Sequence, residues 1–180
     1  MVTLVAKSLF ETKDLHTPLH PETIRDLQVG DRVEISGTIY CGRDAVLPKI
    51  VSMAKAGDLA KAGLHLEGSV IFHSAVSPAG VGPTSSNKLE IEGCIVPLSR
   101  IAGVKLHLGK GSLNEGTVRS LKEHESVYAI IPPVSALLRS KTVKSECVAF
   151  QELGMEAFYR LEVHGYPAII AAAHGESIYS

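Results

Sequence analysis

The sequence lacks the features that mark membrane proteins and nucleic-acid-binding proteins. It has no run of about 18 apolar residues, which excludes a membrane-spanning helix. Its formal net charge at pH 7 is −1, so it has no overall attraction to nucleic acid or to an anionic membrane. Any anion that the chain binds must therefore be held by a local cluster of cations.

Targeting signals are missing as well. The opening stretch MVTLVAKSLFETKD contains no basic segment followed by a long apolar segment, so no secretory signal is predicted. We therefore expect a cytoplasmic protein. The chain also has no tryptophan, an absence that decides nothing about its function.

Cysteine is scarce. The three thiols, Cys41, Cys94 and Cys147, are far apart and form no CxxC pair. An odd, scattered set argues against a disulfide framework, and also against a zinc or iron–sulfur site built by this chain alone. We interpret the three as buried thiols that pack as small apolar side chains.

The composition is that of a globular domain. The chain has 180 residues, of which 45% are hydrophobic, and it shows no internal repeat or low-complexity linker. Strand-like and helix-like segments alternate in its middle, whereas both ends are rich in strand candidates. We therefore predict a single α/β domain over residues 1–180 with a mixed sheet. The predicted strands are 3–6, 31–40 with a possible bulge at Gly37, 69–74, 104–108, 126–131, 143–150, 161–163 and 168–172, and the predicted helices are 21–27, 46–57, 116–125 and 134–138.

The stretch AGVGPTSSNKLE, residues 79–90, combines glycines, a proline and three hydroxyls. Gly82 allows close approach to the backbone, and Pro83 ends the preceding element. One of the hydroxyl residues 84–86 could cap a helix that starts near Lys88, and the free N–H groups of a helix start favour a carboxylate or phosphate. The alternative is an ordinary capped turn between a strand and a helix.

Two further stretches repeat this arrangement of glycine and a polar group after a predicted strand. Arg43 follows Gly42, and Lys110 lies between two glycines. If the strands are parallel neighbours, their carboxyl ends would bring five residues to one small anionic ligand, such as a dicarboxylate. These residues are Arg43, Thr84, Ser85, Lys88 and Lys110. The alternatives are a surface ion pair between Arg43 and Asp44 and a solvated turn at Lys110.

Several motifs in order resemble one family. They are GD–V–ISG–IY–RDA, then GPTS, then LGKG, then ELGMEAFYRLEVHGYPAII and a terminal HGESIYS, and they span about residues 30–179. This order is similar to the β subunit of class I fumarate hydratases, to the C-terminal part of single-chain iron–sulfur fumarases and to the small subunit of L-tartrate dehydratase. The resemblance implies a swivelling β/β/α fold of three layers.

The resemblance also implies a two-part hydro-lyase that hydrates fumarate to (S)-malate reversibly. In that family an α part supplies three cysteines that hold a [4Fe–4S] cluster, and the β part completes the substrate site. We therefore expect an α-subunit partner that carries the cluster, and an α₂β₂ assembly with a contact between β subunits. Tartrate and mesaconate are alternative substrates.

The family's site residues fall on positions of this chain. Arg43 and Lys110 would bind substrate carboxylates, and Lys110 would also be needed for turnover. Thr84 would lie close to the reacting carbon, with Ser85 in place of a second threonine and the backbone from Gly82 donating N–H groups. Lys88 stands where the family usually has arginine, which keeps the charge but loses the planar fork. Leu47 likewise stands where the family has histidine.

Two other functions remain open at this stage. One is a stand-alone enzyme in which Thr84 or Ser85 is a nucleophile, which would require a histidine and a carboxylate nearby in space. The other is a regulatory or scaffold subunit that binds a dicarboxylate without converting it. The lysine at position 88 is the feature that favours this second alternative.

Overall fold

The computed structural model describes residues 11–78, 80–82, 88–132 and 135–180, so the predicted strand 3–6 lies outside it. The strands are β1 (Thr12–His16), β2 (Arg32–Gly42), β3 (Val70–His73), β4 (Ala75–Ser77), β5 (Gly80–Gly82), β6 (Leu106–Gly109), β7 (Val127–Ile130), β8 (Thr142–Ala149), β9 (Phe158–Ala173) and β10 (Glu176–Ser177). The helices are α2 (Pro21–Arg25), α3 (Leu47–Ala56), α4 (Lys88–Ala102), α5 (Glu115–Glu123) and α6 (Ser135–Ser140), with short 3₁₀ turns η1 (Ala60–Ala62) and η2 (Gln151–Glu156).

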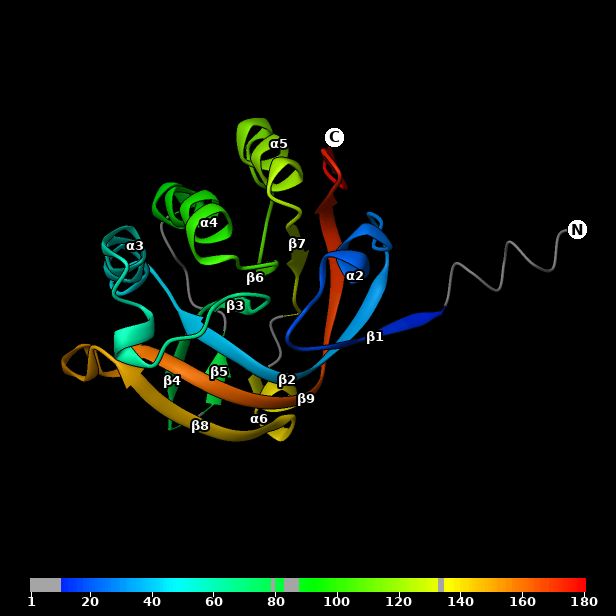
Figure 1. The fold of residues 1–180 in the computed structure, drawn as a ribbon. Coiled ribbons are helices and arrows are strands. Elements are labelled where there is room, and N and C mark those ends of the chain that lie inside the picture. The colour runs from blue at the N-terminus through cyan, green and yellow to red at the C-terminus, as the bar shows by residue number, and fades with distance from the viewer. Residues whose placement is uncertain (1–10, 79, 83–87, 133–134) are drawn as a thin grey trace, which may run out of the picture.

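The main sheet contains parallel and antiparallel strands. Strands β1, β2, β3, β6 and β7 run parallel in that order, and β9 runs antiparallel to β2, β7 and β8. Because β9 pairs with both β2 and β7, the strands β2, β3, β6, β7 and β9 form a closed ring (Figure 1). The predicted α/β class and mixed sheet are confirmed.

The elements form three layers. Helices α3, α4 and α5 lie together on one side of the parallel strands, and β9 with β8 lies on the other side (Figure 1). This order of helices, parallel strands and antiparallel strands agrees with the expected β/β/α arrangement. No helix among the described residues is both long and apolar enough to cross a membrane.

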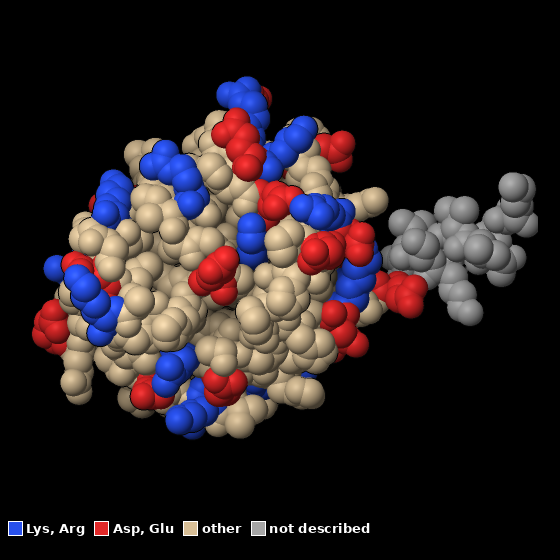
Figure 2. All heavy atoms as spheres, viewed as in Figure 1, with Lys and Arg blue, Asp and Glu red and all other residues tan. Residues whose placement is uncertain are grey.

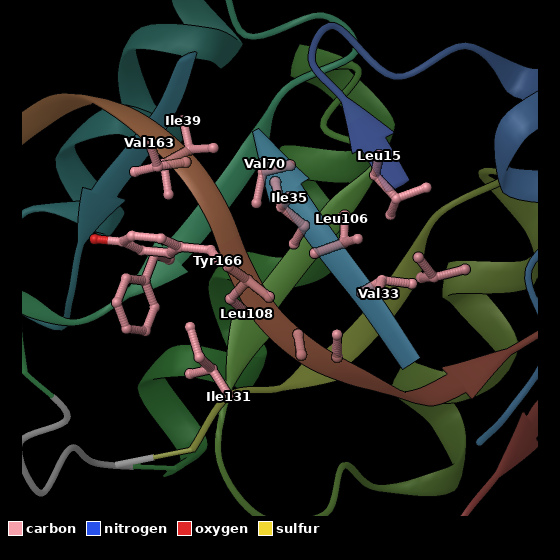
Figure 3. Close-up of a cluster of buried hydrophobic side chains, with 14 of the residues drawn as sticks. Leu15, Val33, Ile35, Ile39, Val70, Leu106, Leu108, Ile131, Val163 and Tyr166 are labelled. Carbon is pink, nitrogen blue, oxygen red and sulfur yellow. The ribbon is translucent and has the colours of Figure 1, made fainter. Parts of the chain in front are cut away.

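The largest hydrophobic cluster fills the ring. Alternate residues of β2, β6 and β9 point inward, so that Ile35, Leu106 and Tyr166 meet inside it (Figure 3). All three are fully buried, and burial of such side chains contributes about 1.5–3 kcal/mol each. A second cluster joins α3 and α4 to the outer face of the sheet, where the rings of Tyr40 and Phe158 stack with centroids 5.3 Å apart.

Helix α3 forms where the sequence predicts it. Pro48 lies in its first turn, where its missing N–H costs nothing. Its C-cap is Gly57, whose φ of 74° is left-handed, and buried Ile50 and Ala54 face the sheet. This helix begins four residues after Arg43, and the Arg43 carbonyl accepts hydrogen bonds from the N–H groups of Val46 and Leu47, which tie that residue to the start of the helix.

The structure corrects one expectation about the glycine-rich stretch. The sequence predicts that it follows the strand at 69–74 directly, but a small antiparallel hairpin of β4 and β5 intervenes. Gly82 ends β5 and pairs with Ala75, which comes two residues after the end of β3. The stretch therefore begins beside the end of β3 but does not continue it.

The structure also corrects the two separate strands predicted at 161–163 and 168–172. They belong to the single 16-residue strand β9. The HGYP sequence between them reads as a turn, but two of its residues, His164 and Gly165, form a bulge opposite Ser36. The Gly165 N–H donates to Ser36 Oγ at 2.9 Å, so pairing with β2 overrides the local turn preference.

Gly37 lies next to this bulge and has a φ of +106°. Alanine is strained at this φ, and its Cβ would meet the Thr17 side chain. We expect Gly37→Ala to lower the free energy of unfolding by about 1–3 kcal/mol, measured by urea denaturation. Gly93→Ala is the matched control, because Gly93 lies in α4 with open space around it and should gain about 0.5–1 kcal/mol. Equal effects of the two substitutions would contradict the prediction.

Candidate functional site

The carboxyl ends of four parallel strands meet at one edge of the sheet. Gly42 of β2 pairs with His73 of β3, and Gly109 of β6 pairs with Ile130 of β7. Phe72 pairs with Leu108, which places the end of β3 beside the end of β6. Arg43 and Lys110 each follow one of these ends, with β3 between them. Two strand spacings separate their backbones by about 10 Å, which is the scale of a small dicarboxylate and its two ligating side chains.

Arg43 is held by carboxylates. Its Nε lies 3.1 Å from Glu156 Oε1 and 3.5 Å from Asp44 Oδ1, and its side chain is only 12% exposed. The surface pair with Asp44, which the sequence left open, is therefore present but partly buried, and η2 contributes a second carboxylate. This environment fixes the guanidinium at the mouth of the site, where it can form a fork with a ligand carboxylate.

Lys110 lies at the other side of the same edge. Its side chain is exposed, and no carboxylate in the described part of the chain pairs with it. It borders a mostly apolar groove of about 460 Å³ that also contacts Ile131, Pro132 and Tyr179. An exposed cation beside an apolar wall is suited to an anion that brings its own charge into the site.

The structure describes the two elements that flank the stretch between β5 and α4. Gly82 ends β5, and Lys88 is the first residue of α4, whereas Thr84 and Ser85 lie outside the described residues. A helix is thus present where the sequence predicts one to begin, although the residue that caps it is not described.

The direction of α4 places its start at the carboxyl edge. Near its start, Glu92 accepts hydrogen bonds from Asn114, which follows β6. Beyond its end, the Gly103 carbonyl accepts from the Gly68 N–H, just before β3. The helix therefore runs antiparallel to the strands, and the positive end of its dipole faces the same edge as Arg43 and Lys110.

The glycines at the strand ends permit close packing. A Cβ on Gly42 would lie 2.8 Å from Val46 Cγ1, and a Cβ on Gly109 would lie 2.9 Å from Tyr128 Oη. Larger residues would therefore displace α3 or Tyr128. Here the glycines serve packing around the site as well as backbone access to it.

Charge is otherwise mixed on the molecule. On the face seen in Figure 2, basic and acidic side chains alternate without a field of one sign. This agrees with the net charge of −1. The cations at the carboxyl edge therefore act locally and not as part of a broad basic surface.

Two buried histidines escaped the sequence analysis. His73 Nε2 lies 3.0 Å from His107 Nδ1, and His107 Nε2 lies 2.9 Å from Ser99 Oγ. Burial lowers the pKa of His73 to about 4, against the opposing effect of Asp44. Burial and the neighbouring His73 also lower the pKa of His107 well below its usual range. Each histidine stands in a short apolar strand, in IFH and KLHL, but neither segment by itself reports that the two side chains are in contact.

The resemblance assigns the iron–sulfur cluster to the α part, so the cysteines of this chain are expected to serve packing. Burial raises the pKa of Cys41 to about 12 and that of Cys94 to about 11. Cys147 lies on β8, and no metal-binding group of three or more His, Cys, Asp or Glu side chains occurs within the described ranges. The chain's own residues therefore offer no cluster site in its described part.

The fold and this edge together define an α/β domain with two cations and a helix start at one edge of its parallel strands. The sequence matches the family described as fumarase C-terminus over residues 6–180. The chain therefore belongs to the fumarase C-terminus family.

Individual relatives support this assignment. The chain is 31% identical to a Methanocaldococcus jannaschii protein named "Putative L(+)-tartrate dehydratase subunit beta", covering 89% of this chain and 88% of that protein. It is 27% identical to the L(+)-tartrate dehydratase subunit beta of Escherichia coli, covering 92% of this chain and 86% of that protein. It is also 29% identical to the anaerobic class I fumarate hydratase of Escherichia coli. That match covers 87% of this chain and 30% of the fumarate hydratase. The chain thus covers about a third of the fumarate hydratases that it resembles.

Proposed function

We propose that this chain is the β subunit of a hydro-lyase that adds water to fumarate reversibly, giving (S)-malate. The observation that carries the proposal is the placement of Arg43 and Lys110 at one edge of parallel strands, with the start of α4 at Lys88 on the same edge. The family membership and the names of its relatives support the same class of reaction.

The chemistry requires positive groups on this side of the substrate. Removing a proton next to a carboxylate of malate builds a second negative charge on that carboxylate. Preorganised cations and N–H donors stabilise such a charge. We assign this role to Arg43, Lys88 and Lys110, with the backbone from Gly82 to Ser85. Thr84 is assigned to proton relay or orientation, since an alcohol is a poor base without an activating neighbour.

A second subunit is part of the proposal. We propose that an α subunit, and not this chain, carries a [4Fe–4S] cluster and docks over the carboxyl edge. The three cysteines are far apart in the sequence and form no CxxC pair, which supports this division. Two of each subunit would give the α₂β₂ assembly implied by the resemblance.

Tartrate is the second candidate substrate. Two of the relatives with high coverage of both chains are named as tartrate dehydratase β subunits. Tartrate carries one more hydroxyl than malate, and that hydroxyl needs a polar partner in the site. The residue types at Lys88 and Leu47 set the polarity and shape available for it.

The test is an anaerobic purification of the tagged chain from its native extract, followed by assays with fumarate, tartrate and mesaconate. We expect co-elution of a larger cysteine-bearing subunit with about four irons per pair and conversion of fumarate. Conversion of tartrate alone would show that tartrate and not fumarate is the substrate, while the class of reaction would stay as proposed. An iron-free chain active by itself would instead support a Thr84 or Ser85 nucleophile. A complex that binds these acids without converting them would support a regulatory subunit.

A further inference from the structure

A chain of three buried polar side chains crosses the helix face of the sheet. Ser99 of α4 contacts His107 of β6 at 2.9 Å, and His107 contacts His73 of β3 at 3.0 Å. Their exposed fractions are 4% for Ser99, 0% for His107 and 6% for His73. Buried polar groups normally make hydrogen bonds. In this set of three side chains, every histidine nitrogen except one has a hydrogen-bond partner.

The unsatisfied atom is His73 Nδ1. It is fully buried and has no hydrogen-bond partner within the described part of the chain. Leaving such a group unpaired is costly, so its position requires an explanation. His73 Nε2 is already committed to His107, and Nδ1 is therefore the atom left for a ligand.

His73 lies at the centre of the candidate site. It is the last residue of β3 and pairs with Gly42, directly before Arg43. On the other side, β6 ends at Gly109, directly before Lys110. The backbone of His73 therefore lies between the strand ends that lead into Arg43 and Lys110.

The number of hydrogens on the two imidazole rings limits the direction in which the hydrogen bonds run. Two neutral imidazoles in contact share one hydrogen between His73 Nε2 and His107 Nδ1. If Ser99 donates to His107 and His107 donates to His73, then Nδ1 of His73 carries the outward hydrogen. An anionic ligand favours this arrangement, in which each hydrogen bond polarises the next.

We propose that His73, oriented by His107 and Ser99, is a further substrate-contacting residue, whose Nδ1–H donates a hydrogen bond to an oxygen of the dicarboxylate held between Arg43 and Lys110. This inference rests on the proposed function. Its contribution differs from that of the two cations, because a neutral donor adds a directed hydrogen bond without adding charge. Such a donor discriminates against ligands that lack an oxygen at that point.

The test compares two replacements of the same histidine in the purified complex. In His73→Asn the amide nitrogen takes the place of Nδ1, whereas in His73→Gln it takes the place of Nε2. We expect His73→Gln to lower kcat/KM for fumarate about 10- to 100-fold and His73→Asn to retain activity within about fivefold. His65→Gln is the control, since His65 is exposed and precedes β3. Thermal unfolding of each variant shows whether it is folded.

The outcomes separate the two proposals. An active wild-type complex with unchanged kcat/KM in folded His73→Gln overturns the role of His73 and leaves the proposed function intact. If neither variant folds, the ¹⁵N NMR spectrum of the uniformly ¹⁵N-labelled wild-type complex, read at the side chains of arginine, lysine and histidine, decides. Fumarate-dependent shifts at Arg43 and Lys110 without a shift at His73 would overturn the inference. A wild-type complex that converts no dicarboxylate, with no shift at any of these residues, overturns both.

Discussion

The Lys110→Met complex is expected to hydrate fumarate about 10³-fold more slowly than the wild-type complex. Methionine keeps the length and flexibility of the side chain but removes the charge that would stabilise the developing negative charge on a carboxylate. Because Lys110 is exposed, its loss should change the free energy of unfolding by no more than about 0.5 kcal/mol. Steady-state kinetics and urea denaturation of the same preparation measure both quantities.

Lys61→Met is the matched control for this substitution. Lys61 is 79% exposed, lies in η1 after the end of α3, and pairs with Asp58 at 2.9 Å. It is therefore a lysine of similar exposure away from the carboxyl edge, and its replacement should leave kcat unchanged. Near-normal turnover in the Lys110→Met complex would show that Lys110 is not required for catalysis.

Acidification is expected to destabilise the chain before its carboxylates are protonated. Burial lowers the folded-state pKa of His73 to about 4, while the unfolded value is about 6.5. Below pH 6.5 the unfolded state therefore binds more protons than the folded state, and stability falls as the pH falls toward 4. From pH 7 to pH 5 this one group lowers the free energy of unfolding by about 2 kcal/mol. The lowered pKa of His107 acts in the same direction.

Urea denaturation at pH 7, 6 and 5 measures this effect. The double variant His73→Asn, His107→Asn removes both titrating groups and should flatten the dependence between pH 7 and pH 5. Glu146, whose pKa is lowered by its hydrogen bond to Arg160, contributes only at lower pH and so does not confuse the comparison. The same pH dependence in the double variant would show that other groups cause it.

The local features of the fold were predictable because they depend on residues close in sequence. Pro48 and Gly57 set the limits of α3, and alternation of apolar residues identified β2, although the bulge expected at Gly37 lies in β9 opposite Ser36. The parallel direction of β2 and β6 was assumed and is confirmed, although β3 separates them. Arg43 and Lys110 were therefore correctly placed at one edge. Their roles, and those of Thr84, Ser85, Lys88 and Gly82, remain predictions.

The remaining features depend on contacts between distant residues. Gly165 and Pro167 favour a turn locally, and only the pairing of β9 with β2 shows that the strand continues through them. The contact between His73 and His107 joins residues 34 positions apart through the pairing of β3 with β6. No periodicity in one segment reports such a pairing, so these two histidines could not be singled out among the eight of the chain.

The closed ring limits how this domain can move. Because β9 is hydrogen-bonded to β2 along most of its length and to β7 at its far end, no strand of the ring can bend away without breaking a ladder on another side. The spacing between Arg43 and Lys110 is then a fixed property of the domain, set before any ligand arrives. Under the proposed function, we expect this domain to move as one rigid body relative to its partner subunit when a ligand enters or leaves. Amide hydrogen exchange within β2 and β9 should accordingly be as slow as global unfolding allows.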